Sequence, residues 1–123
     1  YLKAIVELVD PQKIVSGIGE QPAIDHLRTF GLAGFTAGCV CLTPGKSQSM
    51  LERIQSGDFE EADSIRQQYV ELESLRNTIN PIRVLHEAVT LSWIADMGPP
   101  LPFLSALSAE ERERVAGAVE RLM

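Results

Sequence analysis

The apolar pattern between residues 13 and 41 predicts one β-α-β unit, and the rest of the chain is arranged around it. The run from Ile14 to Ile18 is short, mostly apolar and interspersed with glycines, which predicts a strand that ends in a turn. Residues 22–30 carry apolar side chains at helical spacing, and they predict a helix that Gly31 terminates. Residues 35–41 then predict a second strand. A crossover of this length implies that the two strands are parallel.

The carboxyl ends of these two strands are the first places where a ligand is expected. In parallel α/β units, ligands gather where strand ends, loops and the free N–H groups of helix N-termini meet. Gly19 and Glu20 follow the first strand, and Thr36 lies in the second. A purely structural role, in which the glycines only make tight turns, is the alternative interpretation.

The remaining segments predict helices that cover this unit. Residues 1–9 have an apolar face and predict a short first helix, and four later helices are predicted over residues 49–55, 58–76, 80–95 and 108–122. Asn80 caps the helix that runs past Trp93, and most of its circumference is apolar, so it is expected to be the most buried of the late helices. Arg83 and Glu87 lie one turn apart on it and are expected to form an exposed ion pair.

Composition and charge argue against a nucleic-acid or membrane protein. The chain has 123 residues, 45% hydrophobic and 23% charged, with a net charge of −6. It lacks the cluster of basic residues that phosphates require, so no nucleic-acid partner is predicted. The longest uncharged stretch, residues 29–45, is too rich in glycine for a membrane span. No signal peptide is expected, because Tyr1 opens inside an amphipathic pattern.

The two cysteines are expected to be buried and reduced. Cys39 and Cys41 are two residues apart, so on a strand they would point to the same face at a separation too strained for easy disulfide formation. A metal site would need further ligands at suitable spacing, and His26 and His86 each lie alone on a predicted helix. No metal and no cofactor are therefore predicted, and reduced thiols favour a cytoplasmic location.

Two parallel strands with several helices do not complete an α/β domain. Both outer sheet edges would be unpaired, and most of one face would lack cover, so the strands need neighbours from elsewhere. The first helix also opens in the middle of its pattern. We therefore expect the chain to be the C-terminal part of a larger α/β domain.

Several local motifs resemble the dihydrodipicolinate synthase and N-acetylneuraminate lyase family of (β/α)8 barrels. The segment IVSGIGE is similar to the seventh barrel strand, and GLAGFTAG is similar to the turn and strand eight. GDFEEA, which begins at Gly57, resembles the step from the eighth barrel helix to the appended C-terminal helices. Asn80-Pro81-Ile82 and the segment from Pro100 to Leu104 resemble later parts of that appendage. The resemblance as a whole covers essentially all of the chain from Leu2 to Leu122.

The resemblance implies a fold, a domain division and an activity. Residues 1–56 would be the C-terminal part of a TIM barrel, and residues 57–123 the appended helical segment. The family implies a lyase that condenses, cleaves or dehydrates a pyruvate-type 2-keto acid through a Schiff base on lysine. That lysine lies upstream in the family, so this chain is expected to hold no catalytic residue and to be inactive alone. The complete protein is expected to be a homo-oligomer, either a tetramer or a dimer.

Three positions are candidate substrate-binding residues. The resemblance matches Gly19 to the glycine at the end of strand seven and Thr36 to the strand-eight residue that lines the pyruvyl pocket. Glu20 follows Gly19 directly. Thr36 replaces a branched apolar residue that is common in the synthases, and this difference, together with Glu20, leaves the substrate open.

Gly45-Lys46-Ser47 supports a different interpretation, a phosphate- or nucleotide-binding loop between a strand and a helix. The full P-loop pattern needs a glycine five residues before Gly45, and Val40 stands there. Without that glycine the loop does not surround phosphates with backbone N–H groups. A non-enzymatic helical interaction fragment is the third alternative, although the apolar stripes are typical of a core.

Overall fold

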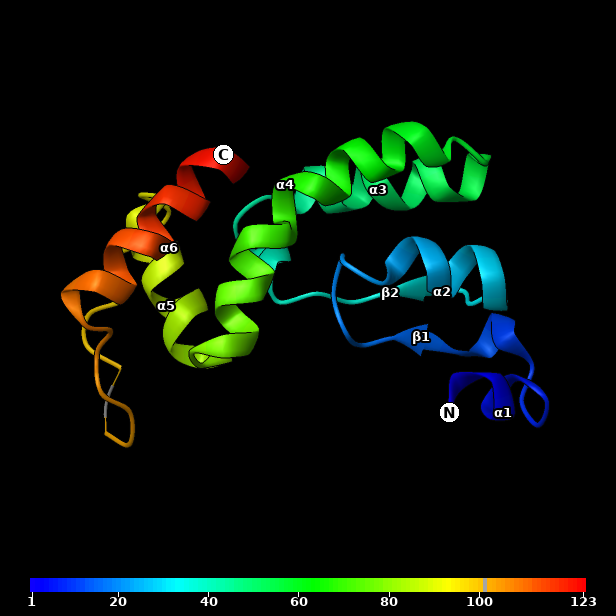
Figure 1. The fold of residues 1–123 in the computed structure, drawn as a ribbon, viewed down its shortest axis with the longest axis horizontal. Coiled ribbons are helices and arrows are strands. Elements are labelled where there is room, and N and C mark those ends of the chain that lie inside the picture. Colours follow the sequence, from blue (N-terminus) through cyan, green and yellow to red (C-terminus); the bar gives the residue numbers. More distant parts are fainter. Residues whose placement is uncertain (101) are drawn as a thin grey trace.

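Two short strands pair in parallel and are connected by a helix, as the apolar pattern predicts. In the computed structural model, which describes residues 1–100 and 102–123, β1 (Val15–Ser16) pairs with β2 (Gly34–Phe35). The helix α2 (Ala23–Phe30) crosses between them (Figure 1). Gly31 ends α2 in the left-handed conformation, with φ 70°.

Both strands are shorter than predicted, and the second prediction is wrong beyond Phe35. Val15 lies opposite Gly34 and Ser16 opposite Phe35, and the chain then leaves the sheet to form the 3-10 helix η2 (Cys39–Cys41). A strand persists only where a ladder partner exists, and this segment instead packs against α4 and α5. A Cβ built on Gly38 would lie 2.6 Å from Leu85 Cδ1.

This change of structure separates the two cysteines. Cys39 is buried and Cys41 is exposed, and both are free thiols. The expectation that both thiols are buried on one strand face is therefore wrong for Cys41, because a 3-10 turn places neighbouring side chains on different sides.

The remaining elements of the described residues are helices. In chain order they are α1 (Leu2–Val6), η1 (Pro11–Lys13), α3 (Pro44–Ser56), α4 (Phe59–Thr78), α5 (Pro81–Leu91) and α6 (Ala109–Leu122). α3 begins five residues earlier than predicted, because Pro44 takes the first helical position, where its fixed φ is favourable. The segment from Pro100 to Leu104, which resembles a family motif, lies before α6. Its Leu101 lies outside the described residues.

Side-chain caps fix the starts of the three late helices. Asp58 accepts a hydrogen bond from the Glu61 N–H, and Asn80 accepts from two N–H groups of the first turn of α5. Ser108 and Glu111 form a reciprocal capping box at α6. Each such cap contributes on the order of 1 kcal/mol to helix stability.

The apolar core has two parts, joined by α4. The strand-side core contains buried residues of α2, α3 and the start of α4: Ala23, Leu27, Leu32, Met50, Ile54 and Ala62. The helical core contains η2 and Leu42 with buried residues of α4, α5 and α6: Cys39, Leu42, Tyr69, Leu72, Leu75, Val84, Ala88, Val115, Ala118, Val119 and Leu122. Ile65 on α4 contacts both. Figure 1 shows α4 running from the strand-side region to α5 and α6. The boundary after residue 56, between the expected barrel part and the appended helical segment, stays a prediction.

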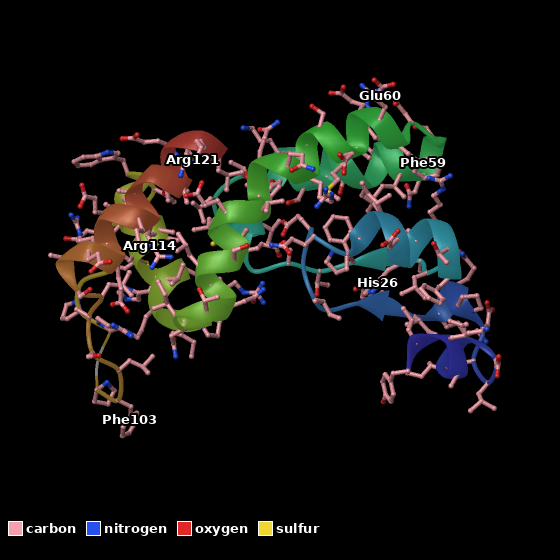
Figure 2. The ribbon with its side chains drawn as sticks, in the orientation of Figure 1. His26, Phe59, Glu60, Phe103, Arg114 and Arg121 are labelled. Carbon is pink, nitrogen blue, oxygen red and sulfur yellow. The ribbon has the colours of Figure 1, made fainter. Side chains whose placement is uncertain are left out.

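α5 is less buried than predicted. It buries only Val84 and Ala88 fully, whereas α6 buries four residues, Val115, Ala118, Val119 and Leu122. The helix ends at Leu91, and Trp93 adopts the left-handed conformation with φ 60° and is 94% exposed. Phe103, in the connector to α6, is also exposed and projects from the end of the molecule (Figure 2).

The predicted Arg83–Glu87 pair is replaced by two pairs across α5 and α6. Arg83 Nη2 lies 3.1 Å from Glu111 Oε2, and Arg112 Nε lies 2.7 Å from Glu87 Oε1. α6 supplies partners that the sequence of α5 alone does not reveal. None of the helices in the described ranges is long and apolar enough to cross a membrane.

Candidate functional site

The carboxyl ends of the two strands bring Gly17 and Thr36 together. The Thr36 N–H donates to the Ser16 carbonyl at 2.7 Å, and a Cβ on Gly17 would lie 4.0 Å from Thr36 Oγ1. Thr36 is exposed and lines a cavity of about 430 Å³, together with Phe35, Ala37, Val40, Pro44, Ser47, Gln48 and Leu51. This volume suits a small organic molecule, and the walls are largely apolar.

Gly17 is a site candidate that the sequence analysis missed. It directly follows Ser16, where β1 ends, so its position after the strand was the available signal. The strand was predicted to continue to Ile18, and this moved the expected strand end two residues too far. Ile18 is instead 61% exposed and lies outside the sheet.

Gly19 is buried and packs against α4. Its φ is 120°, and a Cβ built on it would lie 1.8 Å from Glu73 Oε1. Any side chain here would collide with that carboxylate and hold a backbone conformation that residues other than glycine rarely adopt. The structure thus supplies a packing reason for this glycine, and its predicted contact with substrate stays a prediction.

Glu20 is fully buried at the start of a polar network that connects three segments. Ser47 Oγ, on α3, donates to Glu20 Oε1 at 2.7 Å and lies 3.0 Å from the Tyr69 hydroxyl on α4. Tyr69 in turn donates to the Thr43 carbonyl at 3.1 Å. Burial raises the pKa of the Tyr69 phenol, so Tyr69 is a neutral hydrogen-bonding group.

Glu73, which the sequence analysis did not single out, holds the loop after β1. Its side chain is 1% exposed. Oε1 accepts from the Glu20 N–H at 3.2 Å, Oε2 accepts from the Gln21 N–H at 2.8 Å, and Arg76 Nη1 lies 3.5 Å from Oε1. The pKa of Glu73 is raised to about 7, mainly by burial and also by the charge of Glu20, while the hydrogen bonds from the Gln21 and Glu20 N–H groups oppose the rise.

Cys39 completes a buried group with the two glutamates. One ligand atom from each of Glu20, Cys39 and Glu73 lies within 4.8 Å of the others. Burial, with a smaller effect of the Glu20 charge, raises the pKa of the Cys39 thiol far above its ordinary range. Structural zinc sites are closed by four ligands, and this group offers three among the described residues, so we do not assign it to a metal.

The residues of the proposed phosphate loop are used for packing. Lys46 Nζ donates to Gln68 Oε1 at 2.9 Å and to the Leu122 carbonyl, and the Ser47 hydroxyl donates to Glu20. The groups that a phosphate would need are therefore committed to contacts within the chain. Nothing in this geometry favours the nucleotide-binding alternative.

Solved structures of one kind of enzyme share this fold. A synthase from Bacillus clausii matches 97% of the chain with a TM-score of 0.84 and 24% identity. Another from Oceanobacillus iheyensis matches 86% with a TM-score of 0.76 and 25% identity, and one from Agrobacterium tumefaciens matches 81% with a TM-score of 0.69 and 26% identity. All three are described as dihydrodipicolinate synthases. The chain has the fold of part of a dihydrodipicolinate synthase.

The likeness to the synthases is partial in length. The chain covers 42%, 36% and 33% of these three synthases, respectively. No protein-family model and no curated protein matches the chain. The resemblance inferred from the motifs is confirmed. The chain shares the coarse fold of the synthases, a parallel strand pair surrounded by helices.

Proposed function

We propose that the complete protein is a lyase that acts on a pyruvate-type 2-keto acid through a lysine Schiff base. In this proposal β1 and β2 are the seventh and eighth strands of a (β/α)8 barrel, and α4 to α6 are the appended helices. The observation that carries it is the match to the synthases over 97% of the chain, at a TM-score of 0.84. The order of the motifs along the sequence agrees with this assignment.

The strand ends offer what a small keto acid needs. Thr36 supplies an exposed hydroxyl, and Gly17 beside it carries no side chain, so the carboxyl end of β1 leaves space near that hydroxyl. The apolar lining by Phe35, Ala37 and Val40 suits the carbon skeleton of the substrate. Ligands of parallel barrels bind at this end of the strands.

The Schiff-base lysine is proposed to come from residues outside this chain. Lys3 lies in α1 and Lys13 in η1, and neither lines the cavity beside Thr36. Lys46 donates to Gln68 and to the Leu122 carbonyl. The described residues that line the cavity beside Thr36 include none of these three lysines, which supports a nucleophile from outside this chain.

Borohydride trapping tests the proposal. The longest natural polypeptide that contains this sequence is incubated with pyruvate and borohydride, next to the 123-residue chain, and both are analysed by peptide mass spectrometry. The proposal predicts a reduced pyruvyl adduct on one lysine of the longer polypeptide and none on the 123 residues. An adduct on Lys3, Lys13 or Lys46 would overturn the proposed placement, and the absence of any adduct on the longer polypeptide would overturn the Schiff-base mechanism.

A further inference from the structure

Two buried carboxyl groups meet where α4 packs on the loop after β1. Glu20 belongs to that loop and is 0% exposed, and Glu73 comes from the C-terminal half of α4 and is 1% exposed. One carboxyl oxygen of each lies within 4.8 Å of one carboxyl oxygen of the other, and a side-chain hydrogen bond with Glu20 is among the causes that raise the pKa of Glu73. A pair of this kind is unusual in a protein interior, because two ionised carboxylates at this separation repel each other strongly when water is excluded.

The hydrogen bonds of this pair leave one oxygen without a partner. Both oxygens of Glu73 accept backbone N–H groups, from Glu20 and Gln21, and Glu20 Oε1 accepts from Ser47. Glu20 Oε2 is buried and has no hydrogen-bond partner among the residues that the structure describes. A buried acceptor without a hydrogen bond destabilises the folded protein by roughly 1–3 kcal/mol, unless a donor reaches it. A proton held between the two carboxyl groups is such a donor.

We propose that Glu20 and Glu73 share one proton, and that this carboxyl pair makes Glu73 a positioning residue for the keto-acid site. The neutral half of the pair donates to the other half, which gives Glu20 Oε2 its missing partner. Glu73 then keeps its hold on the N–H groups of Glu20 and Gln21, and so fixes the loop that follows Gly17. The effect on the site rests on the proposed function, whereas the shared proton does not.

The groups that face the pair favour one retained proton. Arg76, on α4, is the cation nearest to Glu73, at 3.5 Å, and compensates for one negative charge. The Cys39 thiol of η2 and the Tyr69 phenol of α4 both have raised pKa values and are neutral, and Ser47 of α3 contributes a neutral hydroxyl. Two ionised carboxylates would leave an uncompensated buried charge. The raised pKa of Glu73, about 7, has the same physical origin.

A metal ion is the alternative occupant of this position, since Cys39 could join the two glutamates as a ligand. The trio lacks the fourth ligand that closes a structural zinc site, and Glu73 already accepts two backbone N–H groups. A proton satisfies Glu20 Oε2 without new ligands. Metal binding is therefore an outcome that the experiments below must exclude.

The shared proton is tested by following the glutamate carboxyl carbons by NMR in the 13C-labelled chain. One buried carboxyl is expected to titrate with a midpoint of about 7, and its signal should vanish in Glu73→Gln. Glu20→Gln should lower the midpoint of Glu73, because the neighbouring charge is removed. Titration of every glutamate near the ordinary value of 4.5 would overturn the proposal. Glu71→Gln, an exposed position on the same helix, should leave the titration unchanged.

The positioning role is tested by hydrogen exchange of the Glu20 and Gln21 amides. Glu73→Ala should speed their exchange about tenfold, and Glu73→Gln, which retains an acceptor, should restore protection. The unsubstituted chain provides the same test if the alanine variant does not fold: protection of these two amides should fall as pH rises through about 7. Unchanged protection in both measurements would overturn the role of Glu73 in holding the loop.

Two further measurements complete the test. Added Zn²⁺ or Co²⁺ should leave the melting temperature and the thiolate absorption unchanged, and a rise in either would identify a metal site and overturn the shared proton. In the polypeptide that forms the pyruvyl adduct, Glu73→Ala should raise the pyruvate concentration for half-maximal trapping about tenfold, with rescue by Glu73→Gln. An unchanged concentration would overturn the positioning role. If no polypeptide forms the adduct, the proposed function fails, and the NMR titration still decides the shared proton.

Discussion

The strand-side region and the helical region of this molecule are held together by different means. Around β1 and β2 the contacts to α4 are buried and polar: Glu20, Ser47, Tyr69 and Glu73 exchange hydrogen bonds across segments that are far apart in the sequence. In α5 and α6 the interior is apolar and the charges form pairs near the surface. Burying polar groups is costly unless they are hydrogen-bonded, so the strand-side region depends on exact donor and acceptor placement, whereas the helical region depends on apolar packing.

The largest expected effect is that of Gly19→Val. The new side chain would collide with Glu73 Oε1 and force an unfavourable φ, so we expect a loss of more than about 3 kcal/mol in the free energy of unfolding, measured with urea. Gly45→Ala is the control, because no atom of the described residues would lie within 4 Å of a Cβ at that position. Equal stability of the two variants would show that Gly19 is not packed against α4.

Leu72→Ala tests the apolar side of the comparison. Leu72 is fully buried in the helical core, and its truncation should cost about 2–5 kcal/mol, depending on how far the site collapses. The loss should be the same at pH 5 and pH 8, since no titratable group is removed. A loss that changed strongly with pH would contradict the separation between polar and apolar regions.

The pH dependence of stability should come from Glu73. Its folded-state pKa of about 7 lies above the ordinary value of 4.5, so the stabilisation is fully present below 4.5 and is lost as pH rises through about 7. The free energy of unfolding should therefore fall by on the order of 2 kcal/mol between pH 5 and pH 8, by linkage. Urea titrations across this range should show a smaller fall in Glu73→Gln. Stability that rises with pH would contradict this account.

Thr36→Val should affect substrate binding with little effect on stability. It keeps the shape of an exposed side chain and removes one hydroxyl, which we propose contacts the keto acid. In the proposed lyase, the transition-state stabilisation calculated from kcat/KM should therefore fall by roughly 0.5–1.5 kcal/mol. Steady-state kinetics measure this. Thr29→Val, near the C-terminus of α2, is the matched control and should retain parental kinetics. Equal kinetics for both variants would remove Thr36 from the site.

Arg112→Ala should have the smallest effect. Arg112 pairs with Glu87 at 2.7 Å, but its side chain is 55% exposed, so water screens the pair. We expect a loss of less than about 1 kcal/mol, decreasing with added salt. A loss comparable with that of Leu72→Ala would show that ion pairs, and not apolar packing, hold α5 to α6.

The sequence predicted local features well. The β-α-β unit followed from a helix with Gly31 at its C-terminus and an apolar run on each side, all within about 30 residues. Asn80 and Pro81 likewise marked the start of α5. These signals are local, because each concerns a backbone conformation that a few neighbouring residues decide.

Features that depend on distant contacts could not be predicted. Residues 39–41 are apolar and suit either a strand or a 3-10 turn, and their contacts with the helical core decide between them. Glu20 was a candidate from its place after a strand, but its neighbour Glu73 lies 53 residues away, on a helix whose pattern gives no hint of the contact. The apolar circumference of α5 did not show which side would remain exposed at Ile82.

The most direct test of the central claim is a crystal structure of the borohydride-trapped pyruvyl adduct in the longest natural polypeptide that contains this chain. The account predicts that β1 and β2 are neighbouring strands of a barrel, and that the adduct lies at their carboxyl ends, in contact with Gly17 and Thr36. An adduct remote from both residues, or strands that are not part of a barrel, would contradict it.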